Sequence, residues 1–118
     1  MLNKRHTLIK IDLDTKDLVE IEKNWKEICW TMDMLNLTIV GSELFPSNQK
    51  GFHRIIEIEE PLQALEIVLV QALCGSDLRR ETFNMARVLL LSDAPLFWHS
   101  RWNNLYSEKL PKEEAKND

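Results

Sequence analysis

The stretch that decides the fold lies near the middle of the chain and reads Asn48-Gln49-Lys50-Gly51-Phe52-His53-Arg54, running directly into Ile55-Ile56-Glu57-Ile58. Aromatic and β-branched residues over 52–58 predict a strand, and the residues 46–49 have the composition of a turn. Residues 37–45 predict a partner strand, so the two form a hairpin. Gly51 lets a backbone or a ligand approach closely, and the neighbouring bases favour an anion there.

Upstream of the hairpin, the sequence predicts one strand and one helix. Residues 7–13 alternate between apolar and polar positions, which is the period of a half-buried strand. Asp17 and Glu20 match a capping box at the start of a helix. Asn36 is expected to end this helix. Its apolar stripe consists of Leu18, Ile21, Trp25, Ile28, Met32 and Leu35.

Two more helices are expected downstream. Glu60-Pro61 predicts a helix start, because proline at the first helical position lacks only a donor that has no partner there. The helix over 62–74 is apolar on nearly all sides, which predicts burial against the sheet and against a second helix or subunit. Gly75 supplies a left-handed stop, and Ser76 is expected to cap a helix from Asp77. The apolar stripe of that helix includes Leu78, Met85, Val88 and Leu89.

The order of these elements predicts the fold class. Residues 102–107 are expected to form a last strand, which gives strand, helix, two strands, helices and strand. That order indicates an α+β domain of the ferredoxin-like or RRM-like split β-α-β type, with a four-stranded antiparallel sheet and helices on one face. Residues 1–108 are expected to form this single domain, and the charged residues 109–118 a disordered tail.

Composition limits the function classes. A formal net charge of −4 argues against a protein that coats nucleic acid by bulk electrostatics, so any contact needs a local basic patch. Cys29 and Cys74 are expected to be buried free thiols, which favours a reducing cytoplasm. The start of the chain lacks the apolar region of a signal peptide, and the apolar run 62–74 is too short to span a bilayer.

The first candidate site joins the central strands. If the apolar face of strand 7–13 packs on the helices, Lys10 and Asp12 lie on the open face of the sheet, beside His53. Asp12 and Asp14 form a D-x-D pair that can chelate Mg²⁺ or Mn²⁺, and His53 can hold a phosphate oxygen. The alternative is a pair of solvated carboxylates where the strand ends.

Two further groups mix cations with other side chains. Arg79, Arg80 and Arg87 form a second basic patch, whose alternative is an ion-paired helix face using Asp77 and Glu81. The aromatic residues near the C-terminus either stack on single-stranded bases or cap the core or a dimer seam. They are Phe97, Trp98, Trp102 and Tyr106, interleaved with His99 and Arg101.

Two resemblances rest on these motifs. The strand ending Ile11-Asp12-Leu13-Asp14 and the turn Lys50-Gly51-Phe52-His53 are similar to the first two motifs of archaeo-eukaryotic-type primases, whose core is RRM-like. The segment 72–81, with Asn84, Arg87 and Trp102-Asn103, resembles small uncharacterised proteins of archaeal viruses and plasmids. A third aspartate on a later strand, which primases carry, is missing, since Asp93 falls in a helix stop.

These resemblances imply a small replication-associated protein of a virus or plasmid, in the cytoplasm of its host cell. We expect it to bind nucleic acid through the open sheet face rather than to catalyse. The expected contact residues are Lys10, Lys50, Phe52, His53 and Arg54. One alternative is a metal-dependent nucleotidyl transferase that uses Asp12, Asp14 and His53. The other is a non-catalytic structural module that forms a homodimer.

Overall fold

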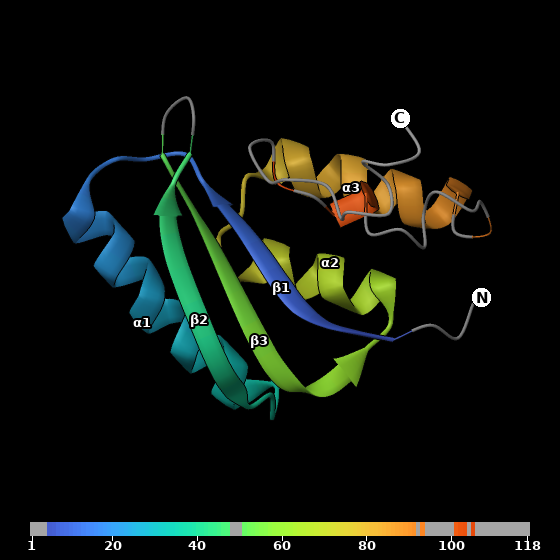
Figure 1. Ribbon diagram of the computed structural model, residues 1–118, viewed down its shortest axis with the longest axis horizontal. Helices are drawn as coiled ribbons and strands as arrows, with labels where there is room; N and C mark the ends of the chain where they lie inside the picture. Colours follow the sequence, from blue (N-terminus) through green and yellow to red (C-terminus); the bar gives the residue numbers. More distant parts are fainter. Residues whose placement is uncertain (1–4, 48–50, 92, 94–100, 104, 106–118) are drawn as a thin grey trace, which may run out of the picture.

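The computed structural model describes residues 5–47, 51–91, 93, 101–103 and 105. Its elements follow one another along the chain as shown in Figure 1. They are β1 (His6–Leu13), α1 (Leu18–Met34), β2 (Ile39–Pro46), β3 (Phe52–Leu62), α2 (Ala64–Leu73), α3 (Leu78–Leu91) and the 3-10 turn η2 (Arg101–Asn103). Within the described part of the chain, no helix is both long and apolar enough to cross a membrane.

The sheet has the order β1-β3-β2, and both pairs are antiparallel. Ile9 lies opposite Ile56 and Asp12 opposite His53, so β3 is the central strand between β1 and β2. This arrangement fits the expected α+β, split β-α-β fold. The predicted fourth strand is wrong for the residues described, because 101–103 form η2 and Leu105 belongs to no strand. The sheet therefore has three strands in the described structure, with β1 at one edge.

The core lies between the sheet and the first two helices. Ile9 and Ile11 of β1, with Ile56 and Ile58 of β3, belong to one buried cluster. The helices contribute buried aliphatic side chains to the same cluster, and Trp102 also joins it. These helical residues are Ile21, Ile28, Met32, Ala64, Ile67, Val68 and Val70. In Figure 1, α2 and α3 lie toward the edge of the sheet that β1 forms, and α1 lies toward the edge that β2 forms.

The ends of α1 follow local hydrogen bonds. Asp17 Oδ1 accepts the Val19 amide at 2.9 Å, which confirms Asp17 as the cap. Glu20 does not complete the capping box, because its carboxylate accepts the Thr15 hydroxyl at 2.9 Å. Asn36 ends the helix with a φ of 57°, as predicted.

The start of α2 differs from the prediction. β3 continues through Glu60 and Pro61, so Pro61 does not open the helix. The Glu60 carboxylate accepts both the amide and the hydroxyl of Thr38, each at 2.7 Å, which extends the contact between the β2 and β3 sides of the hairpin. The helix begins after Gln63, whose backbone amide donates to the Glu66 carboxylate at 2.8 Å. Proline is compatible with this place because its fixed φ also suits extended backbone at a strand end.

The two cysteines differ in environment. Both are free, but Cys29 is exposed, so the expectation that both are buried is wrong for this residue. Cys74 is buried, and burial raises the pKa of its thiol to about 12. A thiol with so high a pKa stays protonated at neutral pH and behaves as a small apolar group.

The orientation of α3 departs most from the prediction. Gly75 has a φ of 88° and stops α2, as expected. The cap of α3 is Asp77 rather than Ser76, since Asp77 Oδ1 accepts the Arg80 amide at 3.0 Å. The buried residues of α3 are the polar Glu81 and Asn84. Met85 and Val88 are half-buried, whereas the predicted stripe residues Leu78 and Leu89 are exposed.

Candidate functional site

The predicted pair on the central strands does form. His53 Nε2 lies 3.4 Å from Asp12 Oδ1, and His53 is only 1% exposed. The Phe45 ring stands edge-on to the imidazole, with 5.6 Å between ring centroids. Burial raises the pKa of the Asp12 carboxyl, against the opposing effect of His53 and Arg80. Asp12 is therefore a half-buried carboxyl held against a buried histidine.

The two aspartates of the D-x-D pair lie in different environments. Asp14 lies in the exposed segment after β1, and Asp12 is engaged with His53. Among the residues that the structure describes, no three His, Cys, Asp or Glu side chains are placed to hold a metal ion. Asp12, Asp14 and His53 therefore do not form a three-ligand site for Mg²⁺ or Mn²⁺.

The five expected nucleic-acid contacts do not share one exposed surface. Lys50 lies outside the described residues. Lys10, His53 and Arg54 are all buried. Phe52 and Arg54 lie on the α1 side of the sheet, opposite to Lys10 and His53, because residues on a strand alternate between its faces. The Arg54 guanidinium is 4.3 Å from the Trp25 ring centroid, and burial lowers its pKa.

At Gly51 the backbones of β3 and β1 come close together, as the glycine at this position suggested. Its φ is 111°, and a Cβ at this residue would lie 2.0 Å from the Leu13 carbonyl oxygen. The end of β1 therefore fits against the start of β3 only because residue 51 has no side chain.

In the described structure, the outer edge of β1 is closed by three side chains and one backbone amide rather than by a strand. The Lys10 amide donates to Gln71 Oε1 at 2.8 Å, and the Lys10 carbonyl accepts from Arg80 at 3.1 Å. The Asp12 amide donates to Ser76 Oγ at 3.0 Å, and the Asp12 carbonyl accepts the Asp77 amide at 2.8 Å. An unpaired strand edge is a row of free backbone donors and acceptors, and these contacts satisfy four of them.

A buried carboxylate organises these side chains. Glu81 accepts Gln71 Nε2 and Ser76 Oγ, each at 2.7 Å, and forms an ion pair with Arg80. Asn84 Nδ2 also donates to Glu81, at 3.2 Å. Hydrogen bonds to a buried charge are strong, and each partner here would be costly to leave unpaired.

Asn103 joins η2 to the same cluster. Its side chain donates to Gln71 at 2.9 Å and accepts from Gln71, Asn84 and Arg80 at 2.9–3.2 Å. The Arg80 guanidinium also donates to the Asn103 carbonyl at 2.6 Å. We call this cluster the edge network, defined as Gln71, Ser76, Arg80, Glu81, Asn84 and Asn103. It ties α2, α3 and η2 to β1.

The edge network separates the three arginines of the second basic patch, Arg79, Arg80 and Arg87. Arg80 is paired with Glu81, but this pair is buried, whereas the alternative expected an exposed ion-paired face. Arg87 donates to Asn84 at 3.1 Å and to the Trp102 carbonyl at 3.2 Å. Arg79 alone points outward, with its guanidinium 6.0 Å from the Phe83 ring centroid. The three arginines therefore do not present their charges together.

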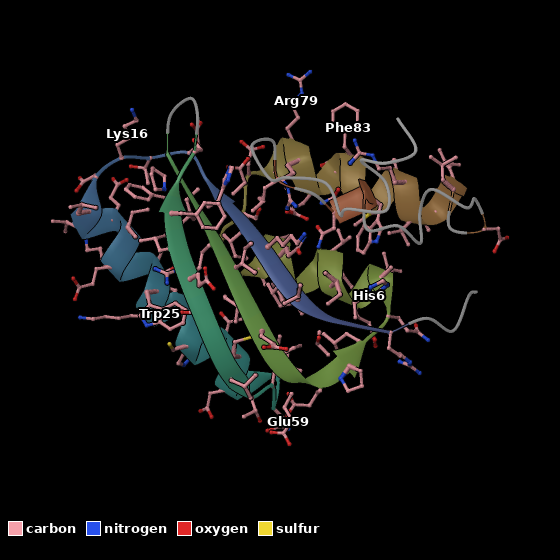
Figure 2. All side chains as sticks on the ribbon, in the orientation of Figure 1. His6, Lys16, Trp25, Glu59, Arg79 and Phe83 are labelled. Atoms are coloured by element: carbon pink, nitrogen blue, oxygen red, sulfur yellow. The ribbon has the colours of Figure 1, made fainter. Side chains whose placement is uncertain are left out.

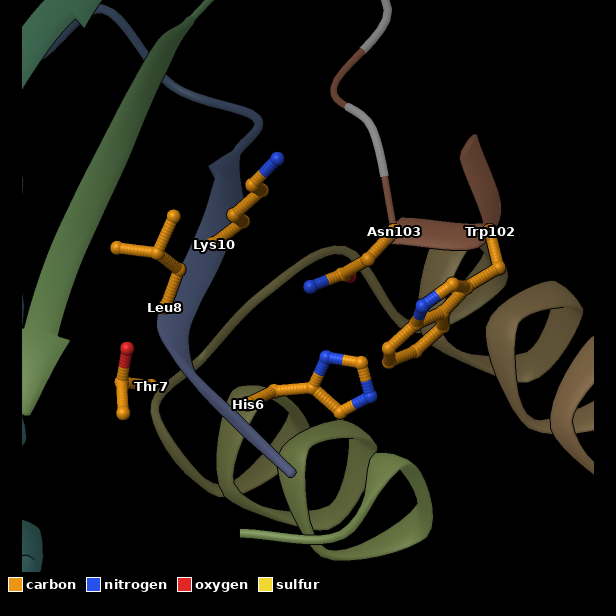
Figure 3. Close-up of a pocket in the computed structure, with 6 residues that line it drawn as sticks. All are labelled: His6, Thr7, Leu8, Lys10, Trp102 and Asn103. Atoms are coloured by element: carbon orange, nitrogen blue, oxygen red, sulfur yellow. The ribbon is translucent and has the colours of Figure 1, made fainter. Parts of the chain in front are cut away.

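A small pocket lies between β1 and η2. It is lined by His6, Thr7, Leu8, Lys10, Trp102 and Asn103, as Figure 3 shows, and its volume is about 160 Å³. The His6 and Trp102 rings meet edge to face, with centroids 5.5 Å apart. Trp102 is buried against the core, which agrees with the interpretation that it caps the core. Residues 97–100 and Tyr106 of the aromatic group lie outside the described residues.

The opposite side of α3 is apolar and open to solvent. We define the outer α3 face as Leu78, Arg79, Thr82, Phe83, Ala86, Leu89 and Leu90. Leu78 is 73%, Phe83 54%, Leu89 66% and Leu90 80% exposed. Part of this face forms a hollow of about 430 Å³, which is lined by Leu78, Arg79, Thr82, Phe83 and Ala86. Figure 2 shows Arg79 and Phe83 projecting from α3 away from the sheet.

No protein-family model, curated protein or solved structure matches this chain. The resemblances to primases and to proteins of archaeal viruses and plasmids therefore stay predictions.

Proposed function

We propose that this protein is a non-catalytic module that forms a homodimer through the outer α3 face. The observation that carries the proposal is the exposure of four large apolar side chains, Leu78, Phe83, Leu89 and Leu90, on one helix. Single exposed apolar residues are ordinary, but a continuous apolar helix face is typical of an interaction surface.

The edge network supports this orientation of α3. Glu81 and Asn84 point inward, where they bond to Gln71 and Asn103. Turning the apolar side inward would take these polar groups away from their partners and leave the edge of β1 unsatisfied. The apolar side of α3 therefore faces solvent, although removing this apolar surface from water would be favourable.

Two other partners fit this face less well. Helices that lie on membranes carry lysine and arginine on their polar face, whereas the polar face of α3 is buried against β1. Arg79 is the sole cation of the outer α3 face, which is too little for binding phosphate backbones. A protein surface is the partner whose chemistry matches.

Sedimentation equilibrium between about 1 and 200 µM tests the proposal. We expect a monomer–dimer equilibrium whose dissociation constant lies in this range, which corresponds to a binding free energy of about 5–8 kcal/mol. Leu90→Glu is expected to weaken the dimer at least tenfold, since it places a charge in the apolar contact. Trp30→Glu is the matched control, because Trp30 is 66% exposed on α1 and its replacement adds the same charge.

A monomer throughout this range would reject the proposal. Equal loss of the dimer in Leu90→Glu and Trp30→Glu would place the contact elsewhere and would reject it as well. Leu90 is exposed, so both variants should keep the thermal stability of the folded protomer.

Nucleic-acid binding through the open sheet face is the function first expected from the sequence. Of its contact residues, Lys10 and His53 are on that face and buried, while Phe52 and Arg54 are on the other. Fluorescence anisotropy with single-stranded and duplex oligonucleotides at low salt tests it directly. Binding that Lys50→Ala with His53→Ala abolishes would favour nucleic acid over the structural module.

A further inference from the structure

We propose that the two α3 helices of the dimer pack antiparallel about a two-fold axis, with Arg79 of each subunit beside the C-terminal end of the partner's α3. This inference rests on the proposed function, since it names the occupant of the outer α3 face as a second copy of the same helix. Closed two-fold dimers are the commonest homo-oligomers, and their contacts are self-complementary.

The charges of α3 favour the antiparallel direction. Arg79 lies in the first turn, where the partial positive charge of a helix N-terminus disfavours a cation. The last turn of α3 contains no basic residue, although cations are favourable at that end. An antiparallel partner supplies the missing cation to each C-terminus. A parallel partner would instead bring Arg79 close to a second Arg79.

Asp93 adds to this complementarity. It is exposed and follows α3 by two residues, at the end where the partner's Arg79 would arrive. Within its own chain, Arg79 lies at the other end of a 14-residue helix, about 20 Å away at 1.5 Å per residue. A pair between Arg79 and Asp93 is therefore available between subunits rather than within one.

The apolar side chains match in the same register. When the axis passes through the middle of α3, residues at equal distances from that middle face each other. Phe83 then lies opposite the partner's Ala86, and Arg79 opposite the partner's Leu90. A large ring against a small methyl group is the combination that lets two helices approach closely. The hollow lined by Leu78, Thr82, Phe83 and Ala86 is the part of the face into which a ring from the second subunit would fit.

A charge exchange tests the direction of packing. Arg79→Glu is expected to weaken the dimer about fivefold in sedimentation equilibrium, because an acid then meets the partner's Asp93 and helix C-terminus. Combining Arg79→Glu with Asp93→Arg should return the dimer constant to within about twofold of wild type, since the pair is rebuilt with reversed charges. Lys26→Glu, at an exposed position of α1, is the control for the same change in net charge.

The outcomes separate this inference from the proposed function. If Leu90→Glu dissociates the dimer but Arg79→Glu has no more effect than Lys26→Glu, α3 is the interface and the antiparallel register is wrong. If the double variant is weaker than Arg79→Glu alone, the register is wrong too. If no α3 variant changes the dimer, or no dimer exists, the proposed function falls and this inference falls with it.

Discussion

Gly51 shows how one residue joins the two central strands. The Leu13 carbonyl oxygen occupies the place where a side chain of residue 51 would begin, and φ is positive at this residue. Both facts require glycine, so the turn that the sequence analysis singled out serves the packing of β1 against β3. This role explains the glycine without a ligand.

Gly51→Ala is accordingly expected to destabilise the protein by about 2–4 kcal/mol, from the strained φ together with the clash at Leu13. Urea denaturation measures the change. Gly41→Ala is the control, because nothing lies within 4 Å of a Cβ at Gly41. A cost for Gly51→Ala no larger than for Gly41→Ala would contradict this account.

Asp12 links stability to pH. Its pKa is raised in the folded state, chiefly by burial, above the ordinary value of 3.8. The stabilisation from a carboxyl with a raised folded pKa is present below the unfolded pKa and is lost as pH rises through the folded value. Asp12→Asn should therefore gain stability relative to wild type as pH rises from about 3 to 6. A relative loss for Asp12→Asn over this pH range would contradict burial as the assigned cause.

At the scale of elements, α3 and the residues just before it close the edge of β1 in the described structure. Gln71 of α2 and Arg80 of α3 satisfy the amide and the carbonyl of Lys10. Ser76 and Asp77, just before α3, do the same for Asp12. Glu81 holds these side chains in place, since Gln71, Ser76 and Arg80 all converge on its carboxylate. The edge of β1 is thereby closed to pairing with another strand.

Removing this carboxylate should loosen the edge. Glu81→Ala leaves the Arg80 charge and the Gln71 amide without their buried partner, and we expect a loss of about 3–5 kcal/mol in the free energy of unfolding. Amide hydrogen exchange at Lys10 and Asp12 should accelerate more than exchange in β3. Glu22→Ala, at an exposed position of α1, is the control. Unchanged exchange at Lys10 and Asp12 would mean that the network does not protect this edge.

At the scale of the whole molecule, the protomer buries its core on one side and leaves an apolar helix face on another. α1 and α2 cover the face of the sheet that holds Ile9 and Ile56. α3 lies beyond β1 with Leu89 and Leu90 in solvent. Among the residues that the structure describes, this outer α3 face is the surface that the proposed dimer would use.

Association would make thermal stability depend on protein concentration. If folding and dimerisation are coupled, the Tm should rise by about 5 °C for a hundredfold increase in concentration. Leu90→Glu should remove this dependence, and Trp30→Glu should keep it. A Tm of the wild-type protein that is independent of concentration would contradict a dimer that contributes to stability.

The elements that the sequence determined by itself are those with local causes. Alternation predicted β1, the three-and-four spacing predicted α1, and Asn36 and Gly75 marked helix ends because their backbone conformations favour those residues. The adjacency of Asp12 and His53 also followed, since the period of two and the strand order together place them opposite each other.

Only the tertiary structure decided which side of α3 faces inward. The sequence pattern placed Leu78 and Leu89 inside, because apolar side chains usually face a core. The edge of β1 needs hydrogen-bond partners instead, and Glu81 and Asn84 meet that need together with Gln71 and Asn103. Contacts between residues far apart in the chain leave no local period in the sequence. The closure of the β1 edge by these side chains and the outward apolar face of α3 could therefore come only from the fold.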